Sequence, residues 1–459
     1  MDFTGLLEPQ KEHSKRLLDS IYLNGCADDL SDTGVGKTFC ACWIASQLQC
    51  PVVVICPNSV KTMWQKTLEK FNVKNTLIIN YELLVRGNTE YLNYDLTKFH
   101  RTAKWWLSEG IKVTFRKDSL VILDEQHKGR GLNSLTSDLL IVLKNQKYKI
   151  LGMSATAATS VADMKAFGYK ANLHNGENFP QWCSDHGARV NRFGTIDWDA
   201  DQTVAKQGMA RIHTNLFNIQ KIASRMRRAD FGHLFPENRV FAEVFDIGAN
   251  ANKLNSVYER MELELDLLDK RAADYSQHAF AVIMKARRQS EILKTPTASE
   301  FIEDMFDEGI SPVIFVNFDD TVQSLTRLLN KKKFKGKIGY LVGGQEQDER
   351  NRYIDDFQSD KLRIFIANIQ AGNMGVSLHD LNGNFPRHSL LFPCWSAINI
   401  IQAIGRIYRA LGKTPCIQRF FYANVPVEVR MASRIGNRVD NMDCLNDGDV
   451  NMEYEFIAK

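Results

Sequence analysis

Ser31-Asp32-Thr33-Gly34-Val35-Gly36-Lys37-Thr38 is the stretch of this sequence that decides its fold. Its glycines let backbone N–H groups approach phosphate oxygens, and the helix expected to follow directs its N-terminus at the same charge. A lysine and a hydroxyl at the end of such a loop suit the phosphates and the magnesium ion of ATP. A glycine turn without a ligand is the alternative. The predicted nucleotide-binding residues are Thr33, Gly34, Val35, Gly36, Lys37 and Thr38.

Two carboxylates end a second informative stretch, Leu120-Val121-Ile122-Leu123-Asp124-Glu125. The apolar run predicts a buried strand, so the acidic pair would lie at its carboxyl end. We expect Asp124 to hold Mg²⁺ together with Thr38, and Glu125 to orient or deprotonate the attacking water. Lys37 would contact the β and γ phosphates. An exposed acidic pair without catalytic work is the alternative, and the phosphate loop upstream argues against it.

Two neighbouring features extend this acidic site. His127 follows the carboxylates closely and either couples them to other motifs or is structural. Ser154-Ala155-Thr156 ends the next apolar run, where its hydroxyls either join the same machinery or form a simple turn or helix cap. The residues alone leave both alternatives open.

Length and composition indicate a multidomain globular protein. The 459 residues are 44% hydrophobic, which predicts two or three domains. No apolar stretch approaches the roughly 20 residues that span a bilayer, and Met1-Asp2-Phe3-Thr4 lacks the layout of a signal peptide. We therefore expect an intracellular protein with no membrane partner. The net charge of +4 is small beside 58 basic and 54 acidic residues, so any basic track must be local. The nine cysteines are scattered and are interpreted as packing thiols.

Short apolar runs alternate with longer amphipathic stretches and predict one parallel α/β sheet in each half of the chain. The expected strands are residues 52–55, 76–79, 120–123, 149–152, 312–316, 339–342, 363–367 and 389–392. Helical insertions are expected at 157–228 and 249–294, and Pro236 is the predicted crossing between the halves. The predicted divisions are 1–236 for the N-terminal lobe, 237–440 for the C-terminal lobe and 441–459 for an acidic tail.

The second half contains the run Gln402-Ala403-Ile404-Gly405-Arg406-Ile407-Tyr408-Arg409. Two arginines three apart share one face of a helix, so both guanidinium groups can reach the same phosphate. Arg406 and Arg409 are predicted as arginine fingers that stabilise transition-state charge, with Gln402 beside them. A solvated basic helix face is the alternative. Upstream, the glycines of residues 371–378 allow close approach of DNA or nucleotide backbone, or form a structural loop.

The order of these motifs resembles that of the superfamily-two helicases over nearly the whole chain, and several stretches are similar to Swi/Snf-type DNA translocases. Pro9-Gln10 resembles the motif in which a glutamine reads adenine. Arg227-Arg228 and Phe235-Pro236 resemble the segment that leaves the first lobe. Arg350 and Phe357 fit the second lobe in the same order. The resemblance implies two RecA-like parallel-sheet lobes with helical insertions, an ATP site in the cleft between them, and ATP and Mg²⁺ as cofactors.

The same resemblance implies contacts with nucleic acid. Residues 57–64 resemble the segment with a tryptophan after the second strand, and Asn80-Tyr81-Glu82 resembles the next DNA-facing motif. Gly375 is assigned to the nucleotide. The residues assigned to nucleic acid are Pro57, Asn58, Ser59, Trp64, Tyr81, Asn317, Asn368, Gln370, Ala371, Gly372 and Trp395.

Three functions are weighed. The first is an ATP-hydrolysing motor that translocates on double-stranded DNA, acting as a monomer. The second is a strand-separating DNA or RNA helicase, and the third is a nucleotide-dependent clamp or sensor with little turnover. Gln126 replaces a common alanine, residues 154–156 are closer to ordinary helicases, and no chromatin-reading domain fits. A compact form from a virus, phage or bacterium is therefore expected, in a bacterial cytoplasm or nucleoid or an infected cell.

Three further stretches receive simpler interpretations. The basic run of residues 331–337 is predicted to be a solvated loop or, alternatively, a phosphate contact. The pair Trp105-Trp106 is predicted to pack in a core rather than to stack on bases. Leu263, Leu267 and Leu268 recur at helical spacing and are also predicted to be core residues.

Overall fold

A computed structural model of the chain describes residues 3–86, 89–94, 104–130, 134–155, 161–190, 196–268, 275–369, 376–394 and 396–431. The described residues form two compact units, the first ending at Gly232 and the second beginning at His233. The division falls close to Pro236. Gln370, residues 371–375, Trp395 and the acidic tail 441–459 lie outside the described residues.

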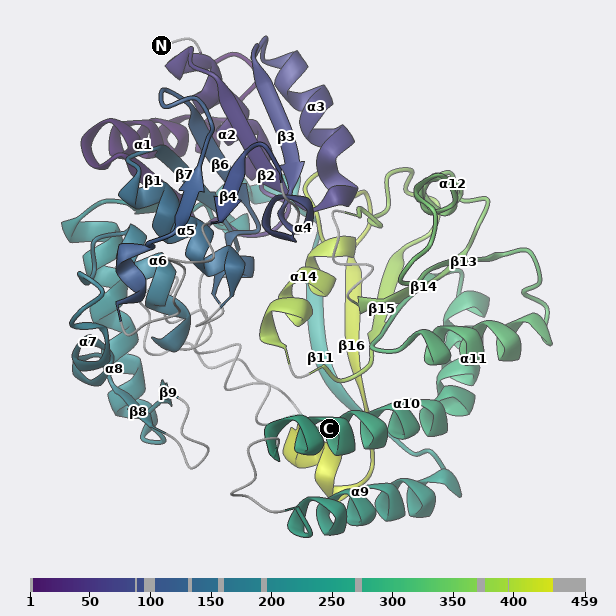
Figure 1. The fold of residues 1–459 in the computed structure, drawn as a ribbon. Coiled ribbons are helices and arrows are strands. Elements are labelled where there is room, and N and C mark those ends of the chain that lie inside the picture. Colours follow the sequence, from purple (N-terminus) through teal and green to yellow (C-terminus); the bar gives the residue numbers. More distant parts are fainter. Residues whose placement is uncertain are drawn as a thin grey trace. The chain divides into compact units, whose positions relative to one another are not determined.

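The first unit is built on a parallel sheet of six strands, ordered β10-β1-β7-β6-β2-β3 (Figure 1). Its strands are β1 (Cys26–Asp29), β2 (Val52–Cys56), β3 (Thr76–Asn80), β6 (Leu120–Asp124), β7 (Lys149–Met153) and β10 (Ala223–Ser224). Its helices are α1 (Glu8–Asn24), α2 (Lys37–Leu48), α3 (Lys61–Lys70), α4 (Tyr81–Arg86), α5 (Leu135–Asn145), α6 (Met164–Lys170), α7 (Phe179–Asp185) and α8 (Gln202–His213). Two short antiparallel pairs, β4 (Leu92–Tyr94) with β5 (Ile111–Val113) and β8 (Ala188–Val190) with β9 (Ile196–Trp198), complete it.

Both faces of this sheet are covered, which is why its strands are apolar throughout. Along β2, Val52 and Val54 pack with α1, α2 and α3, whereas Val53 and Ile55 pack with α5 and the helices that follow it. Alternate side chains of a strand point to opposite faces, so a sheet between two helical layers buries both sets. Because the strands are parallel, their carboxyl ends all lie at the same edge of the sheet, between the two helical layers.

The second unit repeats this plan with a parallel sheet ordered β11-β16-β15-β12-β14-β13 (Figure 1). Its strands are β11 (Asn238–Phe245), β12 (Ser311–Val316), β13 (Ile338–Leu341), β14 (Ile364–Asn368), β15 (Arg387–Leu391) and β16 (Cys416–Ala423). Its helices include α9 (Asn250–Asp266), α10 (Tyr275–Asp307), α11 (Asp319–Asn330), α12 (Gln347–Gln358) and α14 (Ala397–Ile407). Helices α9, α10 and α11 pack on one face and α12 and α14 on the other.

The two parallel sheets predicted from the sequence are confirmed, but four of their strands were not predicted. Strands β1 and β10 are short, and polar residues interrupt β11 and β16, among them Glu243 in β11 and Gln418 and Arg419 in β16. None of the four is apolar throughout. A short strand carries too little pattern for its sequence to separate it from a loop.

The basic run and the leucine stripe show how context changes a local pattern. Lys332 and Lys333 form ion pairs with acidic residues of α10. Phe334, which follows them in the sequence, is fully buried. Leu263 and Leu267 are 66% and 85% exposed, so the prediction that they are core residues was wrong. Leu263 lies on the exposed side of α9, and Leu267 lies just beyond the end of this helix. None of the described helices is long and apolar enough to cross a membrane.

Candidate ATP and nucleic-acid site

The strand order of the first sheet gathers the predicted catalytic residues at one edge. The phosphate loop follows β1, Ser154 follows β7, and Asp124 ends β6. These three strands are adjacent and parallel. The carboxyl ends of parallel strands meet at the same edge, where open α/β sheets bind their ligands. Lys37 accordingly interacts electrostatically with both Asp124 and Glu125.

The phosphate loop has a backbone that demands glycine. Gly34 and Gly36 have φ of 83° and 90°, in the left-handed region that side chains disfavour. Gly36 is the residue before α2, so the loop leads directly into the positive end of that helix. The Nζ of Lys37 donates to the carbonyls of Ser31 and Asp32 at 2.9 Å each. Burial lowers the pKa of Lys37, and phosphate oxygens could replace these carbonyl acceptors.

Arginines after β10 brace the loop from outside. Asp32 accepts a hydrogen bond from Arg225 Nη2 at 2.8 Å and from the Arg228 backbone at 3.0 Å. Arg228 also donates to the Thr33 hydroxyl at 2.5 Å and to its carbonyl at 3.3 Å. Burial alone would raise the pKa of Asp32, but the two guanidinium groups outweigh it and the pKa is lowered. Arg225 and Arg228 therefore support the phosphate loop of their own unit.

A buried histidine supports the strand that precedes the loop. His13 Nε2 lies 3.2 Å from Asp29 Oδ2 and 3.4 Å from Ser31 Oγ, and its Nδ1 lies 2.9 Å from Ser224 Oγ. Asp29 also accepts from the Ser31 backbone at 3.0 Å. Burial opposes the charge of Asp29, but His13, Lys37 and Ser31 together lower its pKa. Sequence reasoning missed His13, because a single histidine in a helix carries no signal.

Gln10 sits beneath the phosphate loop. Its side chain is 4% exposed, and its Nε2 donates to the Val35 carbonyl at 2.9 Å. Its Oε1 accepts from the Leu7 backbone at 2.8 Å. A Cβ built on Gly36 would approach Gln10 Nε2 to 2.4 Å. In this structure the glutamine predicted to read adenine is therefore bonded to the loop itself.

Asp124 is held by two aromatic side chains. Trp64 Nε1 donates to its Oδ2 at 2.8 Å, and Tyr81 Oη donates to its carbonyl at 2.9 Å. Burial, and then the neighbouring Glu125, raise the pKa of Asp124 to about 6, although Trp64 and Lys37 act in the opposite direction. A cation at this carboxylate would offset the cost of its buried charge. The site thus suits Mg²⁺.

Glu125 has an unusual backbone for an L-residue, with φ 56° and ψ 49°. Such a left-handed conformation costs of order 1 kcal/mol and is often found where a functional side chain must be aimed. His127 Nδ1 lies 3.2 Å from both Glu125 Oε2 and Ser154 Oγ. His127 and Ser154 therefore join β6 and β7 beside the proposed base, and a coupling role for His127 stays a prediction.

The buried positions of Trp64 and Tyr81 correct one expectation. Their side chains are 0% and 2% exposed, so in this structure neither offers its ring to nucleic acid, and both serve Asp124. Pro57 is also buried, whereas Asn58 is exposed and Ser59 is partly exposed. The tryptophan-bearing segment thus has an inner face at Asp124 and an outer face at Asn58.

A buried ion pair explains why glutamine follows the acidic pair. Lys170, at the end of α6, pairs with Asp28 of β1, and both side chains are 0% exposed. The same Nζ donates to Gln126 Oε1 at 3.0 Å. Alanine at 126 would leave this ammonium with one fewer acceptor. The adjacent acids Asp28 and Asp29 are a signal in the sequence, because buried carboxylates need partners, but nothing there identifies Lys170.

In the second unit, Asn317 follows β12 and Asn368 is the last residue of the adjacent strand β14. Asn317 donates to Glu291 and to the Pro393 carbonyl, and Asn368 donates to Asp319 Oδ1 at 2.8 Å. Their amides therefore take part in structural hydrogen bonds at the ends of these strands.

The two predicted arginine fingers meet at one carbonyl. Arg406 Nη1 and Arg409 Nη2 each lie 3.3 Å from the oxygen of Val376. Helix α14 ends at Ile407, so Arg409 lies beyond the helix instead of on it. Gln402 and Arg406 are each 5% exposed. The guanidinium groups converge in this structure, but their role at a phosphate stays a prediction, and the helix ends earlier than expected.

The available oxygen donors fit magnesium better than a transition metal. No group of three or more His, Cys, Asp and Glu side chains suited to a metal ion occurs within the described residues. A hydroxyl from Thr38 and a carboxylate from Asp124 are hard ligands of the kind Mg²⁺ takes together with phosphate and water oxygens. These two residues would hold the ion, which would supply charge compensation at the phosphates.

Known proteins resemble this chain in sequence. Residues 6–159 match the family described as type III restriction enzyme, res subunit, and residues 297–411 match the helicase conserved C-terminal domain. Two relatives come from Acanthamoeba polyphaga mimivirus. "Putative ATP-dependent RNA helicase L364" is 30% identical over 96% of this chain and 83% of its own length. "Putative ATP-dependent RNA helicase L538" is 22% identical over 87% of this chain and 84% of its own.

One solved structure matches over a similar span. The Sulfolobus solfataricus SWI2/SNF2 ATPase core in complex with dsDNA covers 97% of this chain and 94% of that chain, with 17% identity and a TM-score of 0.38. The 30% identity to the first mimivirus protein over most of both chains decides the family. This chain belongs to the superfamily-two helicases, which are nucleic-acid-dependent ATPases.

Proposed function

We propose that this protein is an ATP-driven motor that translocates on double-stranded DNA as a monomer. The observation that supports it best is the double role of residues 57–64. Their inner face carries Trp64, which bonds to Asp124, and their outer face carries the exposed Asn58. A DNA phosphate that contacts Asn58 or Ser59 would act on the same short segment that positions Asp124, the proposed magnesium ligand.

This arrangement provides a route from nucleic acid to hydrolysis. Asp124 would hold Mg²⁺ with Thr38, and Lys37 would exchange its carbonyl partners for phosphate oxygens. ATP supplies the scissile bond when it is bound. Glu125, kept in its left-handed conformation and bonded to His127, would orient the attacking water. Small movements of Trp64 or Tyr81 would then alter the position and the pKa of Asp124.

The remaining assignments complete the proposal. Arg406 and Arg409 are proposed to stabilise the charge of the transition state. Contacts to the DNA backbone are proposed for Asn58, Ser59, residues 370–372 and Trp395. Of these, residues 370–372 and Trp395 lie outside the described residues. Backbone contacts of this kind carry no sequence preference. We propose an intracellular location, in a bacterium or an infected host cell.

A strand-separating helicase is the second candidate. Two mimivirus relatives bear names that describe ATP-dependent RNA helicases, and the chain covers more than four-fifths of each. Such an enzyme would open a duplex instead of tracking along it. A clamp with little turnover is a third outcome that the same experiment detects.

The test compares ATP hydrolysis and movement on matched substrates. Hydrolysis by the full chain and by Glu125→Gln is measured without nucleic acid and with single strands, duplex DNA or duplex RNA. Displacement of a third strand from a DNA triplex reports translocation without unwinding, and a forked duplex reports strand separation. Stimulation by duplex DNA with triplex displacement, both lost in Glu125→Gln, supports the motor. Unwinding of the forked duplex, together with ATP hydrolysis that is stimulated by RNA or single strands, favours the helicase. Binding with no hydrolysis favours the clamp.

A further inference from the structure

A basic pocket lies beside the edge strand β10, between α1 and the end of α8. Its volume is about 830 Å³, and all its lining residues belong to the first unit. Four of these residues are cationic and one is anionic; the cations are Arg16, Lys221, Arg225 and Arg227. None of the residues assigned above to ATP or nucleic acid lines it. Its ligand is therefore unassigned.

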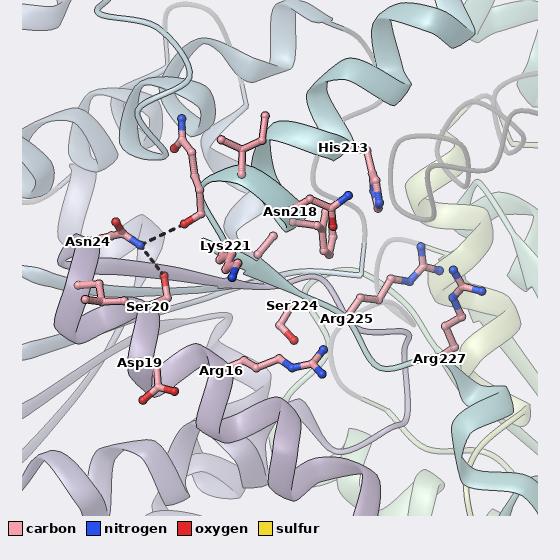
Figure 2. Close-up of a pocket in the computed structure, with 15 residues that line it drawn as sticks. Arg16, Asp19, Ser20, Asn24, His213, Asn218, Lys221, Ser224, Arg225 and Arg227 are labelled. Atoms are coloured by element: carbon pink, nitrogen blue, oxygen red, sulfur yellow. Dashed lines mark hydrogen bonds between the residues drawn. The ribbon is translucent and has the colours of Figure 1, made fainter.

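The charges in this pocket are arranged for a polyanion. In Figure 2, Arg225 and Arg227 extend to the same side of the pocket, and Asp19 points away from them. Arg16 and Lys221 are exposed, and among the described residues Arg16 pairs with Glu12, an exposed i,i+4 partner, at 3.2 Å. Exposed pairs of this kind contribute little and exchange readily for other anions. A chain of phosphates could span these separate cations.

An aromatic pair on the pocket wall adds a second requirement. The rings of His213 and Phe217 stack with centroids 4.4 Å apart and an interplanar angle of 23°. Both side chains are partly exposed, and Asn218 next to them is exposed. Unpaired bases stack on such rings, whereas bases inside a duplex are covered by their neighbours. Carboxylates of an acidic peptide would use the cations but not the stacked rings.

The pocket is also bonded to the support of the phosphate loop. Ser224 on its wall lies 2.9 Å from His13, which contacts Asp29 and Ser31. Arg225 pairs with Asp32 of the loop at 2.8 Å. An anion drawn to Arg225 would compete with Asp32 for the guanidinium. Occupation of the pocket would therefore alter the support of the phosphate loop.

We propose that this pocket binds single-stranded nucleic acid, with phosphates at Arg16, Lys221 and Arg227 and an unstacked base against Phe217 and His213. The site is separate from the motor track proposed above. It does not depend on whether that track is DNA or RNA. A frayed or displaced strand would be its natural ligand.

The experiment measures binding to the full chain without ATP. A fluorescein-labelled oligothymidylate of about 12 nucleotides, a length within the range of single-strand sites, is titrated by fluorescence anisotropy. The variants are Arg16→Glu with Lys221→Glu together, and Phe217→Leu. Asn218→Cys carrying a benzophenone group reports by photocrosslinking whether the oligonucleotide enters the pocket. Lys74→Glu is the matched control, because Lys74 is exposed and does not line the pocket.

We expect the charge-reversal pair to weaken oligothymidylate binding about tenfold or more, and to reduce the salt slope by roughly the two lost phosphate contacts. Phe217→Leu should weaken it several-fold, and the crosslink at position 218 should disappear with the charge reversal. Lys74→Glu should stay within about twofold. Thermal unfolding of each variant confirms folding.

Two results would overturn the proposal. One is unchanged affinity in folded pocket variants together with no crosslink at 218. The other is equal binding of a polyglutamate peptide that displaces the oligothymidylate from the crosslinking probe, which would identify a peptide-type polyanion site. Loss of ATP hydrolysis in Glu125→Gln affects neither readout, so failure of the motor proposal is seen separately.

Discussion

Trp64 Nε1 donates a hydrogen bond to Oδ2 of Asp124 at 2.8 Å, across 60 positions of sequence. The indole is fully buried, so this bond is made in a dry environment where polar interactions are strong. It connects the segment proposed to touch DNA with the carboxylate proposed to hold magnesium. The relationship turns a predicted DNA contact into a positioning residue.

Trp64→Phe should keep most of the packing and lose this hydrogen bond. We expect ATP hydrolysis at saturating nucleic acid to fall about tenfold, since a charge-assisted bond of roughly 1.5–3 kcal/mol is removed. Its dependence on Mg²⁺ concentration should shift upward. Trp43→Phe is the matched control, because Trp43 is buried in the same core and does not bond to Asp124. Equal losses in the two variants would argue for packing alone.

Asp124→Asn should stabilise the protein in the absence of Mg²⁺ and nucleotide while abolishing hydrolysis. The folded state raises the pKa of Asp124 from 3.8 to about 6 by burial, so it binds this proton more readily than the unfolded state. Stability from this group is therefore present below pH 4 and is lost as pH rises through 6. Urea unfolding at pH 7 should show a gain of about 1–3 kcal/mol in the variant. If the difference in unfolding free energy between Asp124→Asn and the unchanged protein does not grow from pH 4 to pH 7, this account is wrong.

Lys170→Met should destabilise the first unit strongly, because it leaves Asp28 buried without its cation. Breaking one side of such a pair costs about 3–5 kcal/mol. The double variant Lys170→Met with Asp28→Leu should recover a large part of that loss. Gln126→Ala, which removes a single acceptor from Lys170, should cost about 1–2 kcal/mol. Denaturant unfolding measures these variants and the single change Asp28→Leu. If the effects of Lys170→Met and Asp28→Leu simply added up in the double variant, the two residues would not interact.

Arg228→Ala should raise the KM for ATP more than it lowers kcat, because the Arg228 side chain donates to the carbonyl and the hydroxyl of Thr33 in the phosphate loop. A several-fold increase is expected for a loop that is less well ordered before it binds. Arg116→Ala is the control, since Arg116 is exposed and pairs with nearby Asp118 at the surface. A fall in kcat with unchanged KM would instead indicate a transition-state role for Arg228.

The sequence by itself determined the phosphate loop, the acidic pair and the two parallel sheets. Glycines at 34 and 36 are required by a left-handed backbone, and strands such as residues 52–56 are apolar because both faces of their sheet are covered. These are local demands, so a short stretch of sequence records them. The same reasoning missed β1 and β10, which are too short to show a pattern.

Only the tertiary structure decided which distant side chains meet. Trp64 and Tyr81 turned out to face Asp124, Lys170 supplies the partner of Asp28 and Gln126, and Arg228 reaches the loop across 195 positions. No local pattern encodes such pairings, because a buried polar group specifies only that it needs a partner. The partner is chosen by the order of the strands and by the helices packed on them.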